Sequence, residues 1–441
     1  MAKKRIKITA KSPISITARK PYGQFYETFN YIPAQTLRGA FAQSLIDKCN
    51  LLSRDPQRQS ICLDCSKGIQ SNCDFYNMIV KEEIVKFGDC YAVNPILIGN
   101  TIPHVLPATA VSCKYYPGFI TGYDYYHELN IVKIKDEVYH GVFDLLVKQI
   151  VYDEIYNDSN LPDYVFNPKC PNCGDIIEPF SGHYQVFPSA NGNVYFNCNP
   201  KMRRFGRSAL NRKTWSAQEG MLYSVLSIAE GNVFLGEIEI SDELDEDTLN
   251  RLVDNIENLR NIGGQSSRGL GNVQIIIDED YQSNIFPLKD RIQMLNQTID
   301  DIRKCKSDKI YFTIDLQSDA ILKGELNEPT AQLDEKMLKS YLKGIDKHFD
   351  DECFKKYEIK LERSYSSASY VGGWSIAWNL PKYTQLVTSK GSVFLFSASM
   401  IDDSLCRSLE LLEQKGIGDN REEGFGKISI CEQFHLEVEP K

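Results

Sequence analysis

Two glycine-rich segments constrain the fold of this chain more than any other feature of its sequence. The first, 263–271, reads GGQSSRGLG and lies between an amphipathic helical pattern and an alternating, strand-like run. The second, 416–426, reads GIGDNREEGFG and lies between patterns of the same two kinds. Glycine adopts positive φ and lets a backbone approach a ligand closely. Exposed backbone N–H groups beside an arginine favour a polyanion such as a phosphate backbone.

The first half of the chain has the element order strand, helix, strands, helix, strand. Alternating apolar residues within 5–16 predict a strand, and apolar residues four apart predict a helix that begins at Pro33. Further elements are expected as strands at 221–228 and 233–240, a helix at 245–260 and a strand at 272–277. This is the order of a split βαβ, or ferredoxin-like, domain.

The second half repeats that order, which indicates a duplicated architecture. Its expected elements are a strand at 309–316, a helix within 334–349, strands at 375–379 and 392–397, a helix at 403–415 and a strand at 427–431. We therefore predict an α+β fold with two ferredoxin-like (RRM-like) domains. The predicted parts are an N-terminal domain at 1–279 with a Cys-rich insertion at about 55–200, a connector at 280–306, and a C-terminal domain at 307–441.

The cysteines of the insertion form pairs with the spacing of metal ligands. The pairs are Cys62-x2-Cys65, with Cys73 downstream, and Cys170-x2-Cys173, with Cys198 downstream. Two such pairs in a chain with reduced thiols indicate a structural zinc site, because each pair offers two thiolates to a tetrahedral ion. The spacing leaves open whether the pairs share one site or form two, and buried free thiols are the alternative.

Charge restricts where a polyanion could bind. The formal net charge is −9, so binding of nucleic acid must be concentrated in local basic patches. One patch is the run 201–213, which holds six Lys or Arg residues. Arg268 in the first glycine loop and Arg421 in the second are further candidates for phosphate contacts, although Glu422 and Glu423 could pair with Arg421 instead.

The sequence has no segment typical of a membrane protein. No stretch approaches the roughly 18 apolar residues of a membrane span, and the charged N-terminus lacks the apolar core of a signal peptide. We therefore expect a cytoplasmic protein without membrane contact.

Catalytic patterns are sparse. The six histidines are scattered, and none has a partner at a recognisable spacing. A metal-independent endoribonuclease could still use His127 or His140 with a lysine. The chain is therefore expected not to be an enzyme, with endoribonuclease activity as the alternative and a zinc-containing protein adaptor as a third hypothesis.

Several motifs together resemble the RAMP superfamily of CRISPR-associated proteins. They include SPISI and YIPAQTLRGAFAQSLI near the start, CPNCG in the insertion, RRFGRSALNRKTW in the basic run, and the loops GGQSSRGLGNV and GDNREEGFGKISI. More narrowly, the chain resembles the large double-RAMP subunit of type III-D effector complexes, in the group that holds the 5′ handle of the guide RNA.

The resemblance implies a non-catalytic subunit that holds the guide RNA handle, caps a filament of backbone RAMP subunits and docks the large polymerase-like subunit. In that group, guide RNA is bound by the glycine loops, the start of the first helix and neighbouring basic residues. The corresponding residues here are Arg38, Arg203, Arg207, Asn211, Arg212, Lys213, Gly263, Gly264, Ser266, Arg268, Gly269 and Gly271.

Overall fold

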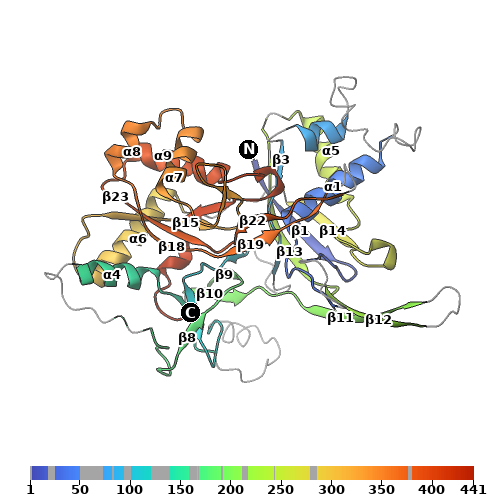
Figure 1. The fold of residues 1–441 in the computed structure, drawn as a ribbon, viewed down its shortest axis with the longest axis horizontal. Coiled ribbons are helices and arrows are strands. Elements are labelled where there is room, and N and C mark those ends of the chain that lie inside the picture. Colours follow the sequence, from blue (N-terminus) through green and yellow to red (C-terminus); the bar gives the residue numbers. More distant parts are fainter. Residues whose placement is uncertain are drawn as a thin grey trace.

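The computed structural model describes most of the chain. The described residues are 2–17, 25–49, 73–81, 84–93, 101–120, 139–157, 166, 168–189, 192–210, 217–242, 244–278, 286–375 and 380–441. The body is a mixed α/β structure built around two larger antiparallel sheets, to which smaller sheets and hairpins are attached (Figure 1).

The first sheet has the strand order β14-β1-β13-β3. Strand β1 (Ala2–Ala10) pairs antiparallel with β13 (Val233–Ile240) on one side and with β14 (Val273–Asp278) on the other. Two short strands, β3 (Val85–Phe87) and β4 (Tyr91–Val93), pair with β13. The predicted range of β13 is confirmed residue for residue.

Two helices pack on this sheet. Helix α1 (Ala34–Asp47) follows Pro33 as predicted. It buries Leu37 and Phe41 in the core beneath the first sheet, and we call this sheet with its helices the first unit and the second sheet with its helices the second unit. Helix α5 (Glu246–Glu257) begins at Asp245, whose carboxylate accepts a hydrogen bond from the backbone N–H of Thr248 at 2.9 Å. This cap satisfies one of the N–H groups that a helix leaves unpaired at its start.

The second sheet has the strand order β18-β23-β15-β24. Its strands are β15 (Ile310–Leu316), β18 (Lys360–Tyr365), β23 (Val393–Ala398) and β24 (Ile428–Ile430). Four helices accompany them: α6 (Leu288–Arg303), α7 (Glu335–Ile345), α8 (Asp351–Tyr357) and α9 (Asp403–Lys415). In both sheets the first strand in sequence (β1 or β15) lies between the last two (β13 and β14, or β23 and β24), and an earlier strand (β3 or β18) pairs with the outer side of β13 or β23.

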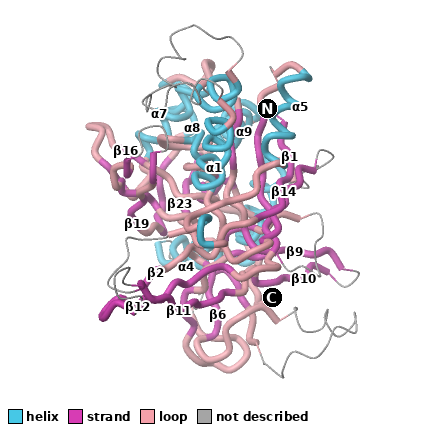
Figure 2. Tube along the Cα trace, turned by 90° about the vertical axis from the view of Figure 1, so that its right-hand side faces the viewer, coloured by secondary structure: helices cyan, strands magenta, loops and turns pink. Residues whose placement is uncertain are grey.

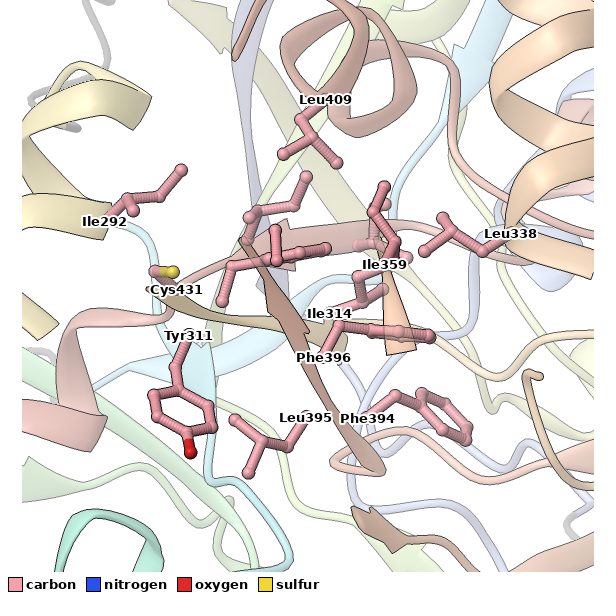
Figure 3. Close-up of a cluster of buried hydrophobic side chains, with 14 of the residues drawn as sticks. Ile292, Tyr311, Ile314, Leu338, Ile359, Phe394, Leu395, Phe396, Leu409 and Cys431 are labelled. Carbon is pink, nitrogen blue, oxygen red and sulfur yellow. The ribbon is translucent and has the colours of Figure 1, made fainter. Parts of the chain in front are cut away.

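The core of the second unit explains why β15 and β23 are almost continuously apolar. Both strands are buried along nearly their whole length, and the rings of Phe312 and Phe396 stack across them with centroids 5.6 Å apart. Leu338 of α7 and Leu409 of α9 enter the same core (Figure 3). A strand buried on both faces loses the alternation that marks a half-exposed strand.

One strand of the second sheet, β18, was not predicted from the sequence. The strand predicted at 375–379 lies outside the described residues except for Ser375, which ends β20 (Trp374–Ser375), and β20 pairs with β21 (Leu380–Pro381). The edge of the second sheet beside β23 is formed by β18. Its pairing with β23 has a break in register between Leu361 and Arg363. The irregular pairing obscures the period-two pattern that would have identified β18.

The described part of the inserted segment between β4 and β11 (Met202–Leu210) forms two small sheets and one helix. One sheet contains β5 (His104–Val105), β9 (His183–Ser189) and β10 (Gly192–Asn197), and the other contains β6 (Ala110–Cys113), β7 (Val142–Asp144) and β8 (Ile177–Pro179). Helix α4 (Leu146–Asn157) packs against α6, and its Leu146, Val147 and Ile150 belong to the core of the second unit.

Each unit carries a hairpin that leads directly into the strand beside its own first strand. In the first unit the hairpin is β11 (Met202–Leu210) and β12 (Ala217–Ile228), which precedes β13 and extends away from the body (Figure 1). In the second unit the hairpin is β19 (Ala368–Val371) and β22 (Gln385–Thr388), with β20 and β21 beyond them, and it precedes β23.

The remaining elements are short. They are β2 (Phe25–Tyr26), the π-helical turn Tyr76–Val80, β16 (Leu322–Lys323), β17 (Pro329–Thr330), and the 3-10 turns Ser266–Arg268, Arg421–Glu423 and Gln433–Leu436. Figure 2 shows α1, α5, α7 and α9 at one end of the molecule and β9 to β12 at the other. In the part of the chain that the structure describes, no helix has the length and apolar character needed to cross a bilayer.

Candidate nucleic-acid interface and metal centre

The first glycine loop has a defined backbone conformation that the segment after β1 holds in place. Its 3-10 turn, Ser266–Arg268, lies between two left-handed residues, Gln265 with φ 62° and Gly269 with φ 81°. Gly264 N–H donates to the carbonyl of Ser15, and Gly271 N–H donates to that of Pro13, both at 2.8 Å. The loop is therefore a fixed platform at the end of the first sheet.

Two of the four glycines of this loop are required by the protein's own backbone. A Cβ on Gly263 would lie 2.5 Å from the carbonyl oxygen of Ser15, and one on Gly271 would lie 2.4 Å from that of Ile262. Gly269 differs, because a Cβ there would meet no atom within 4 Å. Close approach of a ligand backbone, the role expected for these glycines, therefore fits the exposed side at Gly269 but not Gly263 or Gly271.

Arg268 is exposed and points to the β11–β12 hairpin. Its Nη1 donates to the hydroxyl of Tyr223 at 3.0 Å, and Tyr223 of β12 lies directly opposite Arg207 of β11 in the antiparallel register. The tertiary structure thus places Arg268 of the glycine loop beside the basic run, with Tyr223 in contact with both segments. No ion pair to Arg207 or Arg268 occurs among the described residues, so their charges are available to a ligand.

Arginine and aromatic side chains alternate on this face of β11. Residues two apart on a strand share a face, so Arg203, Phe205 and Arg207 lie in a row, and the guanidinium carbon of Arg203 is 4.9 Å from the centroid of the Phe205 ring. Arg203 also forms an ion pair with Glu230 at 2.6 Å. We call Arg203, Phe205, Arg207, Tyr223 and Arg268 the arginine face. The predicted contacts Asn211, Arg212 and Lys213 lie outside the described residues.

The second glycine loop has the same backbone conformation as the first, position for position. Its 3-10 turn, Arg421–Glu423, lies between left-handed Asn420 with φ 55° and Gly424 with φ 92°. Ile417 N–H donates to the carbonyl of Gly426 at 2.9 Å, as Ile262 N–H does to that of Gly271 at 2.8 Å. In this alignment Glu423 takes the place of Arg268, and Arg421 takes the place of Ser266.

The second loop forms a joint between the two units. Glu423 accepts a hydrogen bond from Gln35 of α1 at 2.9 Å and forms an ion pair with Lys382 of the second hairpin. A Cβ on Gly424 would lie 2.2 Å from the Cβ of Ala34 and 2.8 Å from the carbonyl oxygen of Phe87. A loop with an acidic side chain at this position, packed against α1, is unsuited to hold phosphate as the first loop could.

The start of α1 does not offer the phosphate site expected at Arg38. The N–H of Ala34, at the first turn, donates to the carboxylate of Asp89 at 2.9 Å. The Arg38 guanidinium donates to the carbonyl of Ile79 at 2.9 Å. A carboxylate already occupies the helix N-terminus, where a phosphate would otherwise bind, and Arg38 links α1 to a neighbouring turn.

Four side chains of the insertion form a candidate metal centre: Cys113, His140, Cys170 and Cys173. Their ligand atoms all lie within 4.8 Å of one another. The Sγ atoms of Cys113 and Cys173 are 3.7 Å apart, and Cys170 Sγ is 3.4 Å from His140 Nδ1. With Zn–S of about 2.3 Å and Zn–N of about 2.0–2.1 Å, tetrahedral ligands would lie about 3.8 and 3.5 Å apart. The donor set and its spacing therefore fit a structural Cys₃His zinc site.

Local structure holds these ligands at the ends of three adjoining strands. Cys113 ends β6, His140 precedes β7, and Cys170 and Cys173 lie in the turn before β8. Gly174, with φ 74°, lets its N–H donate back to the Cys170 carbonyl at 2.8 Å, which closes the turn. The His140 ring packs on Tyr116 with centroids 4.5 Å apart.

The predicted ligand set is thus partly changed. Cys170 and Cys173 belong to the cluster, as expected, but their partners are Cys113 and His140, which the sequence pattern had not indicated as ligands. Cys73 begins the segment of the π-helical turn and is not in the cluster, and Cys198 is buried near Gln185 instead. Cys62 and Cys65 lie outside the described residues.

A buried charged triad joins the insertion to the second unit beside this centre. His435 lies between Asp144 of β7 and Asp315 of β15, with its Nδ1 bonded to Asp144 and its Nε2 2.8 Å from Asp315. Burial alone lowers the pKa of His435, but the charges of Asp315 and Asp144 outweigh burial and raise the pKa well above its ordinary value. The imidazolium therefore supplies a positive charge between the two buried carboxyl groups.

A family model of the RAMP superfamily matches residues 7–274, which is more than half of the chain. The chain therefore belongs to the RAMP superfamily. None of the curated proteins matches it.

Chains of CRISPR complexes are among the solved structures that match this chain. A chain of the type III-B Cmr-β complex bound to cognate target RNA and AMPPnP has 11% sequence identity and a TM-score of 0.38, over 92% of each chain. A chain of the Cmr-β complex bound to cognate target RNA has 11% identity and a TM-score of 0.37, over 96% of each chain. A chain of a type IV-B CRISPR complex has 10% identity and a TM-score of 0.24, over 65% of this chain and 94% of that one. Likenesses of this degree do not identify a function.

Proposed function

We propose that this chain is a non-catalytic RNA-binding subunit of a type III CRISPR effector complex, of the type III-D kind, that holds the 5′ handle of the guide RNA. In this proposal its two sheets with their helices are ferredoxin-like RAMP domains. The observation that carries the proposal is the meeting of Arg268 and Arg207 at Tyr223, which forms one exposed basic face from two segments far apart in the chain.

The chemistry of the arginine face suits single-stranded RNA. Guanidinium groups bind phosphate oxygens through paired hydrogen bonds, and aromatic rings between them stack on unpaired bases. The segment that contains β11 supports this use, because residues 179–218 include neither Asp nor Glu in a chain with 59 acidic residues. Local absence of acid lets a protein of net charge −9 bind a polyanion.

The structure of the insertion favours a scaffold over a nuclease. His140, one of two histidines considered for endoribonuclease chemistry, lies with Nδ1 3.4 Å from Cys170 Sγ in the metal cluster. A histidine that binds a structural zinc ion cannot act as a general base, because the metal takes the lone pair needed to accept a proton. His127 lies outside the described residues. We propose zinc as the metal, with Cys113, His140, Cys170 and Cys173 as its ligands.

Partners follow from the same proposal. A subunit at the 5′ handle would contact a backbone RAMP subunit and the large polymerase-like subunit of the complex. Sequencing the RNA that co-purifies with the tagged full-length chain tests the central claim. One repeat-derived 5′ end should be enriched, whereas RNA no more abundant than in an untagged control would contradict the proposal.

Incubation of labelled repeat RNA with the purified chain in EDTA separates the scaffold from the endoribonuclease. A scaffold leaves the RNA intact and retains it on a filter. A discrete cleavage product that disappears in the His127→Ala variant would instead establish the nuclease.

A further inference from the structure

The hairpin of the second unit exposes large apolar side chains at the surface. Tyr370, Trp374, Leu380 and Tyr383 have exposed fractions of 72%, 57%, 59% and 93%. They come from β19, β20, β21 and the segment before β22, and we call this element the aromatic hairpin. Isolated exposed apolar residues are ordinary, but a group of them on one projection marks a binding surface.

The aromatic hairpin is held firmly by its opposite face. Val371 and Val387 pack on Ile321 and on Phe425 of the second glycine loop. Thr388 exchanges backbone hydrogen bonds with Ala320 at 2.8 and 2.9 Å. The outward aromatic side chains therefore lie on an ordered support, so binding a ligand there would cost little ordering of the backbone.

Like β11 of the first hairpin, the aromatic hairpin lies in a stretch of sequence without acidic residues. Residues 363–401 contain neither Asp nor Glu, as residues 179–218 do not, and these are the two longest acid-free stretches of the chain. The stretch 179–218 contains β11 and ends at the start of β12, where Glu219 follows it, whereas the stretch 363–401 contains the whole aromatic hairpin. Each hairpin contacts its unit's glycine loop. The aromatic hairpin thus combines exposed aromatic side chains with a sequence free of Asp and Glu. Both properties favour binding of a polyanion that has unpaired bases.

The two hairpins also reach the same side of the molecule. In Figure 2, β19 and β12 both lie on the left side of the molecule, with β19 toward the helical end.

We infer that the aromatic hairpin is a second nucleic-acid contact, at which Tyr370, Trp374 and Tyr383 stack on unpaired bases of single-stranded RNA. The inference rests on the proposed RNA-binding function, and it assigns a different part of the ligand to each hairpin. The arginine face holds phosphates, and the aromatic hairpin holds bases. The aromatic hairpin, residues 368–388, has one Lys or Arg in its sequence, Lys382. Lys382 forms an ion pair with Glu423, so stacking supplies the binding energy at this hairpin.

The test is the triple variant Tyr370→Ala, Trp374→Ala, Tyr383→Ala in the full chain, with a mixed-sequence single-stranded RNA as probe. Affinity should fall by at least about tenfold, the loss expected for one unstacked base. The dependence of affinity on salt should stay unchanged, because no phosphate contact is lost. The matched control, Leu326→Ala with Tyr156→Ala, removes side chains that are 89% and 78% exposed elsewhere, and it should bind as the unmodified chain does.

A probe RNA with abasic sites separates bases from phosphates. If bases are stacked, the triple variant and the unmodified chain should bind the abasic RNA equally weakly. Addition of the normal RNA should also quench the fluorescence of Trp374 in a Trp215→Phe, Trp378→Phe background, since base stacking quenches indole.

Unchanged affinity of the triple variant for normal RNA, with Arg207→Ala still impairing binding, would overturn the inference and leave the proposed function intact. Loss of a co-purifying protein subunit without loss of RNA would overturn it in favour of a protein interface. No RNA binding by the unmodified chain would remove both proposals.

Discussion

Arg268 and Glu423 occupy the same position in two glycine loops that share one backbone conformation. Each is the last residue of a 3-10 turn between two left-handed residues. Arg268 is exposed and reaches Tyr223 of its hairpin, whereas Glu423 is partly buried and bonds Gln35 and Lys382. The charge at this position of the loop is thus reversed between the two units. The loop with Arg268 forms part of an exposed basic face, and the loop with Glu423 forms a joint between the units.

Replacement of Arg268 by alanine should weaken RNA binding with little loss of stability, because the side chain is exposed and its hydrogen bond to Tyr223 is at the surface. Loss of one charge-assisted contact should lower affinity by about tenfold. The slope of log affinity against log salt should become shallower by about 0.7, since one phosphate contact is lost. Fluorescence anisotropy with labelled single-stranded RNA measures both quantities.

The matched control for this variant is Arg407→Ala on the outer side of α9, which removes the same charge from another exposed site. It should leave both the affinity and the slope nearly unchanged. Equal losses in the two variants would mean that only overall charge matters, and the arginine face would have no special role.

Alanine at Gly424 should destabilise the protein much more than alanine at Gly269. Both residues have positive φ, which costs an alanine about 1–2 kcal/mol. Only at Gly424 does the new methyl group collide with Ala34 and Phe87, which adds about 1–3 kcal/mol of overpacking. Thermal unfolding of the two variants measures the difference, and equal midpoints would argue against a packed joint at the second loop.

Serine at Cys113 should remove the same metal ion as serine at Cys170. Both thiols belong to the cluster in which all ligand atoms lie within 4.8 Å, and a tetrahedral site with one thiolate missing binds zinc far more weakly. Metal content by atomic emission, together with the thermal midpoint, reports the loss. Cys353→Ser, whose thiol lies near the His348 carbonyl instead, is the control. An unaltered zinc content in the Cys113 variant would show that the cluster is not the metal site.

Stability that depends on His435 should be greatest at low pH. The pKa of His435 is raised in the folded protein, so its contribution is complete below the unfolded value of about 6.5 and is lost as pH rises through the folded pKa. Replacement of His435 by glutamine leaves Asp144 and Asp315 without a counter-charge. At pH values below about 6.5 the replacement should lower the free energy of unfolding by about 3–5 kcal/mol.

Urea unfolding of the unmodified chain and the His435→Gln variant across pH gives this difference directly. The comparison at each pH cancels other titrating groups, such as Lys390, whose pKa burial lowers to about 8. His348→Gln, at an exposed position, should show no such difference. A gap between the two chains that widens with rising pH would contradict a charged His435.

The sequence by itself determined the features that depend on neighbouring residues. Strand β13, helix α9 and both glycine loops could be located from period, caps and turn residues, because these signals act over a few positions. The Cys170-x2-Cys173 turn was recognisable for the same reason. Strand β18 was missed because its register breaks beside Leu361, so the local pattern is lost.

Only the tertiary structure decided which of these local features meet. Cys113 and His140 join Cys170 and Cys173 because three strands of one small sheet end at the same place, and no spacing along the chain encodes that. Arg268 reaches Tyr223 opposite Arg207 because the loop and the hairpin fold toward each other, and Glu423 meets Gln35 because the two units pack together. Local sequence fixes backbone conformation, but contacts between distant segments depend on how whole elements bury their apolar faces.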